Sequence, residues 1–192
     1  MALHVFFDGL LILWVVWVGY WVASAVYERA TAKTKETVRR ARGFGFVFII
    51  LLLILLTPIG YEGPLGYVVL QTSAAVKAAG LATAAAGISL AIWARRRLGA
   101  NWSRTPSVKK GHTLVTGGPY SIVRHPIYTG ILFGVIGSVL VLWTVGSLVI
   151  VPLAVLVLRA RMRQEEKLMQ ETFGDAYSDY RRRTKAIVPW LW

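Results

Sequence analysis

The sequence contains no cysteine, only nine acidic residues and only three histidines among its 192 positions. The absence of cysteine excludes disulfides, thiolate metal ligands, a cysteine nucleophile and S-acyl anchors. Three histidines without cysteine do not make a zinc ligand set, so we expect no metal site. Charged residues are 16% of the chain, against roughly 25% in soluble domains. This composition excludes disorder and argues against a small soluble domain.

Hydrophobic residues make up 56% of the chain and gather in long runs. A helix that crosses a bilayer needs about 20 mainly apolar residues. The last run, residues 126–158, is uncharged and too long for one straight span. We interpret it as a tight helical hairpin that turns near Trp143 and Thr144. The sequence therefore predicts a single all-α membrane domain, residues 1–192, with five spans at about 5–26, 44–59, 74–93, 126–142 and 145–160.

The basic residues are distributed unevenly along the chain. Of 22 Lys and Arg residues, 21 lie in segments 27–43, 94–125 and 159–192, and only Lys77 lies elsewhere. With five spans these segments share one side, which the positive-inside rule makes cytoplasmic. We therefore expect the N-terminus outside, the C-terminus inside, and cofactor-binding cytoplasmic segments at about 95–125 and 161–192. The length and style of the chain are typical of a prokaryotic inner-membrane protein.

Membrane position also explains the net charge of +13. Basic residues that flank spans need no polyanionic ligand, so we expect the lipid bilayer as a partner and no nucleic acid.

A distinctive polar stretch precedes the fourth predicted span. Residues 117–119 are Gly-Gly-Pro, which forces a turn and lets the backbone approach a ligand closely. Pro126 suits the first position of the next helix, where its missing N–H costs nothing. Arg124 and His125 are thereby placed at a helix N-terminus on the membrane surface, beside free N–H groups that favour anions.

A second polar stretch follows the fifth predicted span. Glu165 and Glu166 lie two turns beyond the apolar run, on an extension of the same helix. Gly174 is suited to end that helix, and Asp175 to cap a short helix that follows. Because the last two spans form a hairpin, their cytoplasmic ends are neighbours. We therefore expect residues 124–125 to converge with residues 165–166.

The two stretches contain an ordered set of motifs. They are His-Thr-Leu-Val at 112–115, Gly-Pro-Tyr at 118–120, Arg-His-Pro at 124–126, Tyr-Thr-Gly at 128–130, Glu-Glu-x-Leu at 165–168 and Phe-Gly-x-x-Tyr-x-x-Tyr at 173–180. This set closely resembles the isoprenylcysteine carboxyl methyltransferase family, and more broadly the membrane methyltransferases that include phospholipid N-methyltransferases. Residues 98–103, Leu-Gly-Ala-Asn-Trp-Ser, resemble the family's prokaryotic members. The resemblance covers about residues 95–190.

The resemblance implies methyl transfer from S-adenosylmethionine to a lipophilic acceptor at the cytoplasmic membrane face, with S-adenosylhomocysteine as product. It assigns donor binding to His112, Leu114, Val115, Gly118, Tyr120, His125, Tyr128, Glu165 and Glu166. It suggests Arg124 and one glutamate, for which we choose Glu166, as catalytic residues. We add Tyr177 and Tyr180 as contacts to the acceptor.

The chemistry of these residues leaves two kinds of acceptor open. A carboxylate is already nucleophilic and needs alignment and desolvation, and the guanidinium of Arg124 could hold it through two hydrogen bonds. An amine has to lose a proton, which gives a glutamate the role of base. We expect a carboxylate, with phospholipid or amine N-methylation as the alternative.

Plainer interpretations compete with these assignments. Arginines beside spans are commonly interfacial anchors, and we prefer that role for residues 95–97 and 181–182 but not for Arg124. A solvated face of salt bridges among residues 161–167 would also account for Glu165 and Glu166.

Two other classes of function stay open. NADPH-dependent sterol or isoprenoid reductases resemble the same fold, but their motif tends to place an acid where this chain has Ile131. The last alternative is a non-catalytic membrane scaffold.

Overall fold

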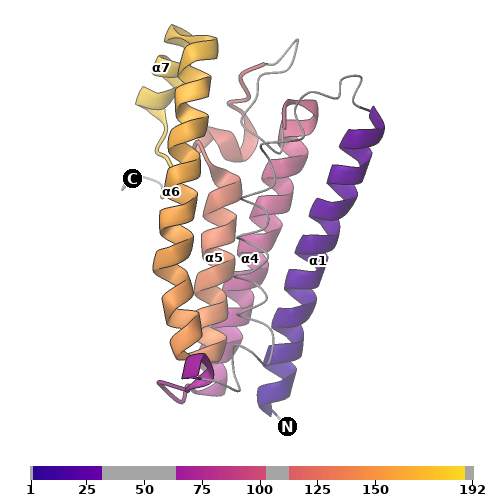
Figure 1. The fold of residues 1–192 in the computed structure, drawn as a ribbon, viewed down its shortest axis with the longest axis vertical. Coiled ribbons are helices and arrows are strands. Elements are labelled where there is room, and N and C mark those ends of the chain that lie inside the picture. The colour runs from indigo at the N-terminus through magenta and orange to yellow at the C-terminus, as the bar shows by residue number, and fades with distance from the viewer. Residues whose placement is uncertain (1, 32–63, 103–112, 189–192) are drawn as a thin grey trace.

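The computed structural model describes residues 2–31, 64–102 and 113–188, and long helices dominate these ranges. The helices are α1 (Ala2–Thr31), α4 (Ala74–Leu98), α5 (Pro126–Leu142), α6 (Val145–Phe173) and α7 (Asp175–Arg183), with 3-10 turns η1 (Pro64–Gly66), η2 (Gly99–Asn101) and η3 (Gly118–Ser121). In Figure 1 the four long helices run side by side, with α5 between α6 and α4, and α1 beside α4. The described part of the chain is therefore all-helical, as predicted.

Among the described helices three, α1, α4 and α6, are long and apolar enough to cross a bilayer. Helix α5 is apolar but has only 17 residues, and its bounds are those predicted for the fourth span. Helix α6 continues well past its apolar part, as expected for the segment that carries Glu165 and Glu166. The predicted span at 44–59 lies outside the described residues, so the total of five spans stays a prediction.

The hairpin between α5 and α6 turns where the sequence indicated. Trp143 ends α5 in the left-handed conformation, with φ of 45°, and its N–H donates to the carbonyl of Val139. Thr144 then caps α6: its hydroxyl accepts from the N–H of Ser147, and the Ser147 hydroxyl accepts from the N–H of Thr144. This reciprocal capping box satisfies backbone donors that would otherwise be orphaned at the start of α6.

Small residues let α4 and α5 pack closely. A Cβ on Gly87 would lie 2.5 Å from the carbonyl oxygen of Gly130, and one on Gly80 would lie 2.8 Å from that of Gly137. Only glycine permits such a distance between two helix backbones, which is a common contact in membrane bundles. Helix α1 adds Trp14, which is buried and donates to the hydroxyl of Ser138 at 3.1 Å.

The described basic residues, apart from Lys77, gather at one end of the bundle. Three consecutive arginines lie in the last turn of α4, Arg124 precedes α5, and the charged part of α6 continues into α7 at the same end (Figure 1). Lys77 lies in the first turn of α4, at the opposite end. This arrangement is the one that the positive-inside interpretation requires, although the side of the membrane stays a prediction.

The C-terminal segment folds back onto the start of α5. The N–H groups of Arg124 and His125 donate to the carbonyls of Lys185 (2.8 Å) and Ala186 (3.0 Å), and the hydroxyl of Thr129 donates to that of Ile187 (2.8 Å). We call residues 184–188 the C-terminal strap.

One detail differs from the prediction: Gly174 caps both α6 and α7, and Asp175 is the first residue of α7 rather than its cap. With φ of 51°, Gly174 supplies a conformation that an aspartate rarely adopts.

Candidate functional site

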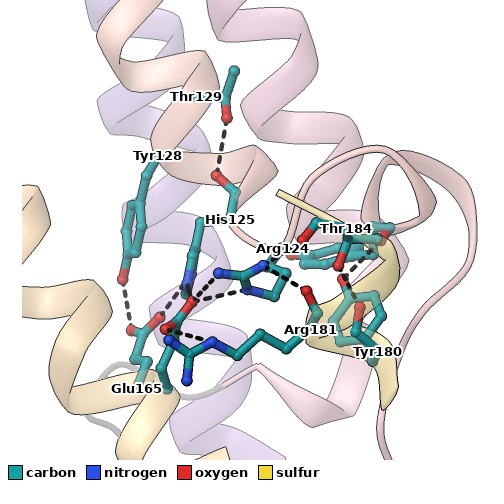
Figure 2. Close-up of polar contacts among 10 residues, drawn as sticks. Arg124, His125, Tyr128, Thr129, Glu165, Tyr180, Arg181 and Thr184 are labelled. Carbon is teal, nitrogen blue, oxygen red and sulfur yellow. Dashed lines mark hydrogen bonds and ion pairs between the residues drawn. The ribbon is translucent and has the colours of Figure 1, made fainter. Parts of the chain in front are cut away.

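The predicted convergence of the two polar stretches is present in the structure. Arg124, just before α5 (Figure 2), donates from its guanidinium to Glu166 on the extension of α6. Both Nε and Nη2 of Arg124 lie 2.8 Å from Oε1 of Glu166. The arginine side chain is 10% exposed and the glutamate side chain 19%. This pair is therefore more than a solvated surface salt bridge.

His125 lies between the two glutamates. Its Nε2 is 3.3 Å from Oε1 of Glu166, and its Nδ1 is 3.7 Å from Oε2 of Glu165. The imidazole is buried and stacks on the ring of Tyr128, with 5.5 Å between ring centroids. Two carboxylates and one histidine thus share a site between the α5 N-terminus and α6.

Besides His125, Glu165 has two contacts that Glu166 does not share. The hydroxyl of Tyr128 donates to its Oε1 at 2.6 Å, and Nε of Arg161 contacts the same oxygen at 2.9 Å. Arg161 is one turn earlier on α6, so this is an i,i+4 ion pair of the kind that the salt-bridge interpretation foresaw. The two adjacent glutamates consequently differ: Glu166 pairs across elements with Arg124, and Glu165 pairs within its helix and with Tyr128.

The environment keeps Glu166 ionised. The apolar part of α6 ends at Leu158, and Glu166 lies in the polar extension beyond it. Partial burial raises the pKa of its carboxyl, but hydrogen bonds from His125 and Arg124 and the charge of Arg124 lower it more, to about 2. At neutral pH Glu166 is therefore an anion and a weak base.

Both tyrosines of α7 are buried, and Tyr180 contacts the loop before α5. The hydroxyl of Tyr180 donates to the carbonyl of Tyr120 at 2.7 Å. Burial raises the pKa of Tyr180 to about 12, against the lowering effect of Arg124, and burial and the charge of Glu166 raise the pKa of Tyr177. Burial and the charge of Glu165 also raise the pKa of Tyr120. All three side chains are neutral, packed phenols beside the charged cluster.

The loop that holds the remaining predicted donor residues is only partly described. Leu114 and Val115 are half-buried, Gly118 is exposed with φ of 65°, and His112 lies outside the described residues. Within the described ranges, no hydrogen bond or ion pair links Leu114, Val115 or Gly118 to the charged cluster. Asn101 holds the start of this loop through two hydrogen bonds with Thr113, at 3.0 and 3.1 Å.

Sequence reasoning missed two features of this end of the bundle. Arg95, assigned to the interface, is instead buried, with its guanidinium carbon 4.0 Å above the ring of Trp102. The strap was not foreseen: Nη1 of Arg124 donates to the backbone carbonyl of Thr184, and lies 3.4 Å from that of Arg181. No pattern of residue types reports a contact with a backbone carbonyl, so the sequence offered no sign of it.

Fold and site together define an integral membrane protein with a polar cluster at one end of its helical bundle. Residues 80–171 match the sequence profile of the isoprenylcysteine carboxyl methyltransferase (ICMT) family. The solved structure of the eukaryotic intramembrane Ras methyltransferase ICMT superposes with a TM-score of 0.69, covering 100% of this chain and 68% of that one at 19% identity. The chain therefore has the ICMT fold, and its residues 80–171 are similar to the ICMT family.

Curated relatives are similar over part of their length. Protein-S-isoprenylcysteine O-methyltransferase of Rattus norvegicus is 33% identical over 119 residues, which are 60% of this chain and 42% of the relative. The cobalt-zinc-cadmium resistance protein CzcN of Cupriavidus metallidurans is 36% identical over 86 residues, 44% of this chain and 39% of the relative. The chain thus spans about two fifths of the length of these relatives.

Proposed function

We propose that this protein transfers a methyl group from S-adenosylmethionine to the carboxylate of a lipophilic acceptor, at the cytoplasmic face of the membrane. The observation that carries the proposal is the cluster in which Arg124, His125 and Glu166 meet beside Tyr128 and Glu165. The start of α5 and the polar extension of α6 together form this cluster, at the basic end of the membrane bundle. The names of the relatives support the reaction class.

The chemistry of the cluster fits the methyl donor. S-adenosylmethionine carries an α-ammonium, an α-carboxylate, a ribose diol and an adenine. Glu165 and Glu166 offer carboxylates for the ammonium or the diol, and the loop over residues 113–118 offers backbone amides. The stacked rings of His125 and Tyr128 offer an aromatic surface. We assign donor binding to these residues, together with His112, Leu114, Val115, Gly118 and Tyr120.

The state of Glu166 favours a carboxylate acceptor over an amine. A general base works best when its pKa is near the operating pH, and the pKa of Glu166 is lowered to about 2. An amine acceptor would have to use a base other than Glu166, whereas a carboxylate needs none. In the proposed step a carboxylate oxygen attacks the methyl carbon as the bond from that carbon to sulfur breaks. The products are a methyl ester and S-adenosylhomocysteine. The negative charge of the carboxylate and the positive charge of the sulfonium are both lost in the step.

The role of Arg124 is revised by its contacts. Its Nε, Nη2 and Nη1 all face protein acceptors, so the guanidinium does not present a fully open fork to an acceptor carboxylate. We assign Arg124 to holding Glu166 and the strap in place, and to attracting the acceptor carboxylate through its charge and the remaining N–H of Nη2. Alignment of this kind accounts for much of the rate in bimolecular transfers.

The test uses purified protein in detergent with methyl-labelled donor and a lipid extract of the host. We expect calorimetry to show saturable binding of S-adenosylmethionine and of its demethylated product. We also expect label in a lipophilic product that mild alkali releases as methanol, as it does from a methyl ester. Alkali-stable label would favour N-methylation instead. Binding of NADPH, without binding of S-adenosylmethionine or its demethylated product, would favour a reductase. Absence of binding for all three compounds would favour a scaffold.

A matched pair of variants links donor binding to the cluster. Glu165→Gln removes the carboxylate that Tyr128 and Arg161 contact, and we expect it to weaken donor binding about 10-fold or more. Glu171→Gln, an equal change on the exposed face of the same helix, serves as the control. Equal affinity of the two variants would contradict the assignment of Glu165.

A further inference from the structure

The loop at residues 113–121, which we call the donor loop, contains four of the residues assigned to the methyl donor: Leu114, Val115, Gly118 and Tyr120. Within the described ranges, no hydrogen bond or ion pair joins Leu114, Val115 or Gly118 to the charged cluster. The cluster therefore does not fix this part of the loop directly. Other contacts have to hold the loop beside it.

The centre of the donor loop lies against the last turn of α4. A Cβ on Gly117 would lie 3.0 Å from Nη2 of Arg97, and one on Gly118 would lie 3.6 Å from Cδ of Arg97. Arg97 is exposed, and the far end of an arginine side chain has many rotamers. This contact lets the loop approach α4 closely but fixes it weakly, so the two ends of the loop matter most.

Asn101 holds the first residue of the donor loop. Its Oδ1 accepts from the N–H of Thr113 at 3.0 Å, and its Nδ2 donates to the Thr113 hydroxyl at 3.1 Å. Gly99, with φ of 53°, ends α4, and η2 then carries the chain to Asn101. An amide side chain that both accepts from and donates to one residue fixes its orientation as well as its distance. The contact gives a role to the Gly and Asn of the motif at residues 98–103.

Tyr180 of α7 holds the other end of the donor loop. Its side chain is buried, and its hydroxyl donates to the carbonyl of Tyr120 at 2.7 Å. The carbonyl of Tyr180 in turn accepts from the hydroxyl of Thr184 on the C-terminal strap, also at 2.7 Å. Burial and the charge of Glu165 raise the pKa of Tyr120, so the phenol of Tyr120 is close enough to interact with that glutamate. Holding the backbone of Tyr120 therefore also places its phenol near the charged cluster.

We propose that Asn101 and Tyr180 are positioning residues of the methyl-donor site, which fasten the donor loop at its two ends. This inference rests on the proposed function, which assigns the loop to the donor. Asn101 acts through Thr113, and Tyr180 acts through Tyr120. A loop that is fastened before the donor arrives loses less conformational entropy on binding, and the affinity for the donor is higher. Tyr180 is thereby assigned to the loop rather than to the acceptor, because its one O–H donates to protein.

Amide hydrogen exchange of the full-length protein in detergent, without donor, tests whether the two side chains hold the loop. Asn101→Ala removes both contacts to Thr113, and Tyr180→Phe removes only the hydroxyl that contacts Tyr120. We expect the amides of residues 113–121 to exchange about 10-fold faster in each variant. Unchanged exchange of these amides in either variant would overturn the proposal, whether or not the protein binds S-adenosylmethionine.

Calorimetry with S-adenosylhomocysteine then measures the effect on the donor site. We expect the Kd of Asn101→Ala and of Tyr180→Phe to rise about fivefold or more, with a stoichiometry near that of wild type. A loss of folded protein would lower the stoichiometry and leave the Kd of the folded fraction unchanged. No acceptor is present in this titration, so a higher Kd cannot come from a lost contact to the acceptor.

A conservative variant tests the hydrogen bonds of Asn101. In Asn101→Asp the carboxylate can accept from both the N–H and the hydroxyl of Thr113. We expect this variant to recover most of the affinity that Asn101→Ala loses. Equal Kd values for Asn101→Asp and Asn101→Ala would overturn the role given to these hydrogen bonds.

Two control variants lie at the opposite end of the bundle. Tyr67→Phe removes the same hydroxyl as Tyr180→Phe, from a tyrosine that is 72% exposed. Ser147→Ala breaks the capping box of α6, so it lowers stability without a contact to the donor loop. Both should keep the Kd within about twofold of wild type, because distant sites act independently.

Two outcomes of the titrations would overturn the proposal. One is a Kd for Tyr180→Phe equal to that of Tyr67→Phe. The other is a loss of affinity in Ser147→Ala as large as in Asn101→Ala, which would mean that general stability sets the affinity. Failure of the proposed function is distinct from both: wild-type protein would then bind neither S-adenosylmethionine nor S-adenosylhomocysteine, and the donor role of the loop would fall with it.

Discussion

Arg124 and Glu166, 42 positions apart in the chain, are joined by two 2.8 Å contacts from one guanidinium to one carboxylate oxygen. The turn at Trp143 and Thr144 closes the α5–α6 hairpin at one end, and this pair closes it at the other. Arg124 also contacts the carbonyl of Thr184, so the same guanidinium fastens the strap. One residue therefore holds together the three segments that surround the proposed site.

The first prediction concerns Glu166→Gln and its dependence on pH. The pKa of Glu166 is lower in the folded protein, about 2, than its usual value of 4.5. Its contribution to stability is therefore present above about pH 4.5 and is lost as the pH falls toward 2, with a magnitude of about 2–3 kcal/mol. We expect Glu166→Gln to melt at a lower temperature than wild type at pH 6, and the difference to shrink by pH 3. Tryptophan fluorescence in detergent measures both profiles.

Glu171→Gln is the control for that experiment. Glu171 is on the same helix, is 60% exposed and lies 3.9 Å from Lys167. A pair this exposed contributes less than about 1 kcal/mol, so this variant should follow the wild-type profile. A Glu166→Gln profile that also follows wild type would show that the pair with Arg124 contributes nothing to stability.

Much of this arrangement follows from residue types and their spacing. The length of the uncharged run at 126–158 implied a hairpin, and Pro126 fixed the start of its first helix. Once the hairpin is accepted, the meeting of Arg124 with one of the two adjacent glutamates follows from geometry alone. The sequence could not say which glutamate pairs with Arg124, because Glu165 and Glu166 point about 100° apart on one helix and the choice depends on the rotation of α6.

The strap is the part that the sequence could not predict. It is held by backbone carbonyls of residues 184–187, which every residue possesses, so no side-chain pattern marks them. The burial of Arg95 is a similar case. Arg95, Arg96 and Arg97 are the same residue type in one helical turn, and the folded position of Trp102 after the turn of η2 shows that Arg95 is a covered one.

The second prediction tests the contact between α4 and α5. A methyl group added at Gly87 would lie 2.5 Å from the carbonyl oxygen of Gly130 and 2.7 Å from the N of Gly134, both backbone atoms that cannot rotate away. The helices must separate, and we expect Gly87→Ala to destabilise the fold by about 1–3 kcal/mol. Gly19→Ala is the matched control, because nothing lies within 4 Å of its added methyl group. Equal melting temperatures for the two variants would contradict the close packing.

The third prediction is the orientation of the chain in the membrane. Because the sequence has no cysteine, single cysteines report their own accessibility without background. Tyr67, 72% exposed, lies beside the α5–α6 turn, and Glu171 lies at the basic end of the bundle. In intact cells we expect an impermeant thiol reagent to label Tyr67→Cys but to label Glu171→Cys only after permeabilisation. Labelling of both in intact cells would refute the predicted orientation.

The last prediction separates a role of Arg124 in methyl transfer from its structural role. Arg124→Lys keeps the charge but loses the planar fork that contacts Glu166 and the strap at the same time. We expect methyl transfer to fall about 10²-fold, because misalignment of the reactants is costly. The melting temperature should fall as well. Arg96→Lys, a change at an exposed arginine in the last turn of α4, should leave both quantities near wild type.

A loosened strap alone would also slow transfer, so a second variant is needed. Thr129→Val removes the 2.8 Å hydrogen bond to the carbonyl of Ile187 without changing any charge in the cluster. If Arg124 acts on the acceptor, Arg124→Lys should lose far more kcat than Thr129→Val at a comparable drop in melting temperature. If the two variants lose activity in proportion to their loss of stability, Arg124 only fastens the strap. If Arg124 has only a structural role, its substitution raises the fraction of inactive protein. If it has a direct role, the substitution lowers the transfer rate of the folded fraction. Single-turnover rates normalised to bound donor distinguish these two outcomes.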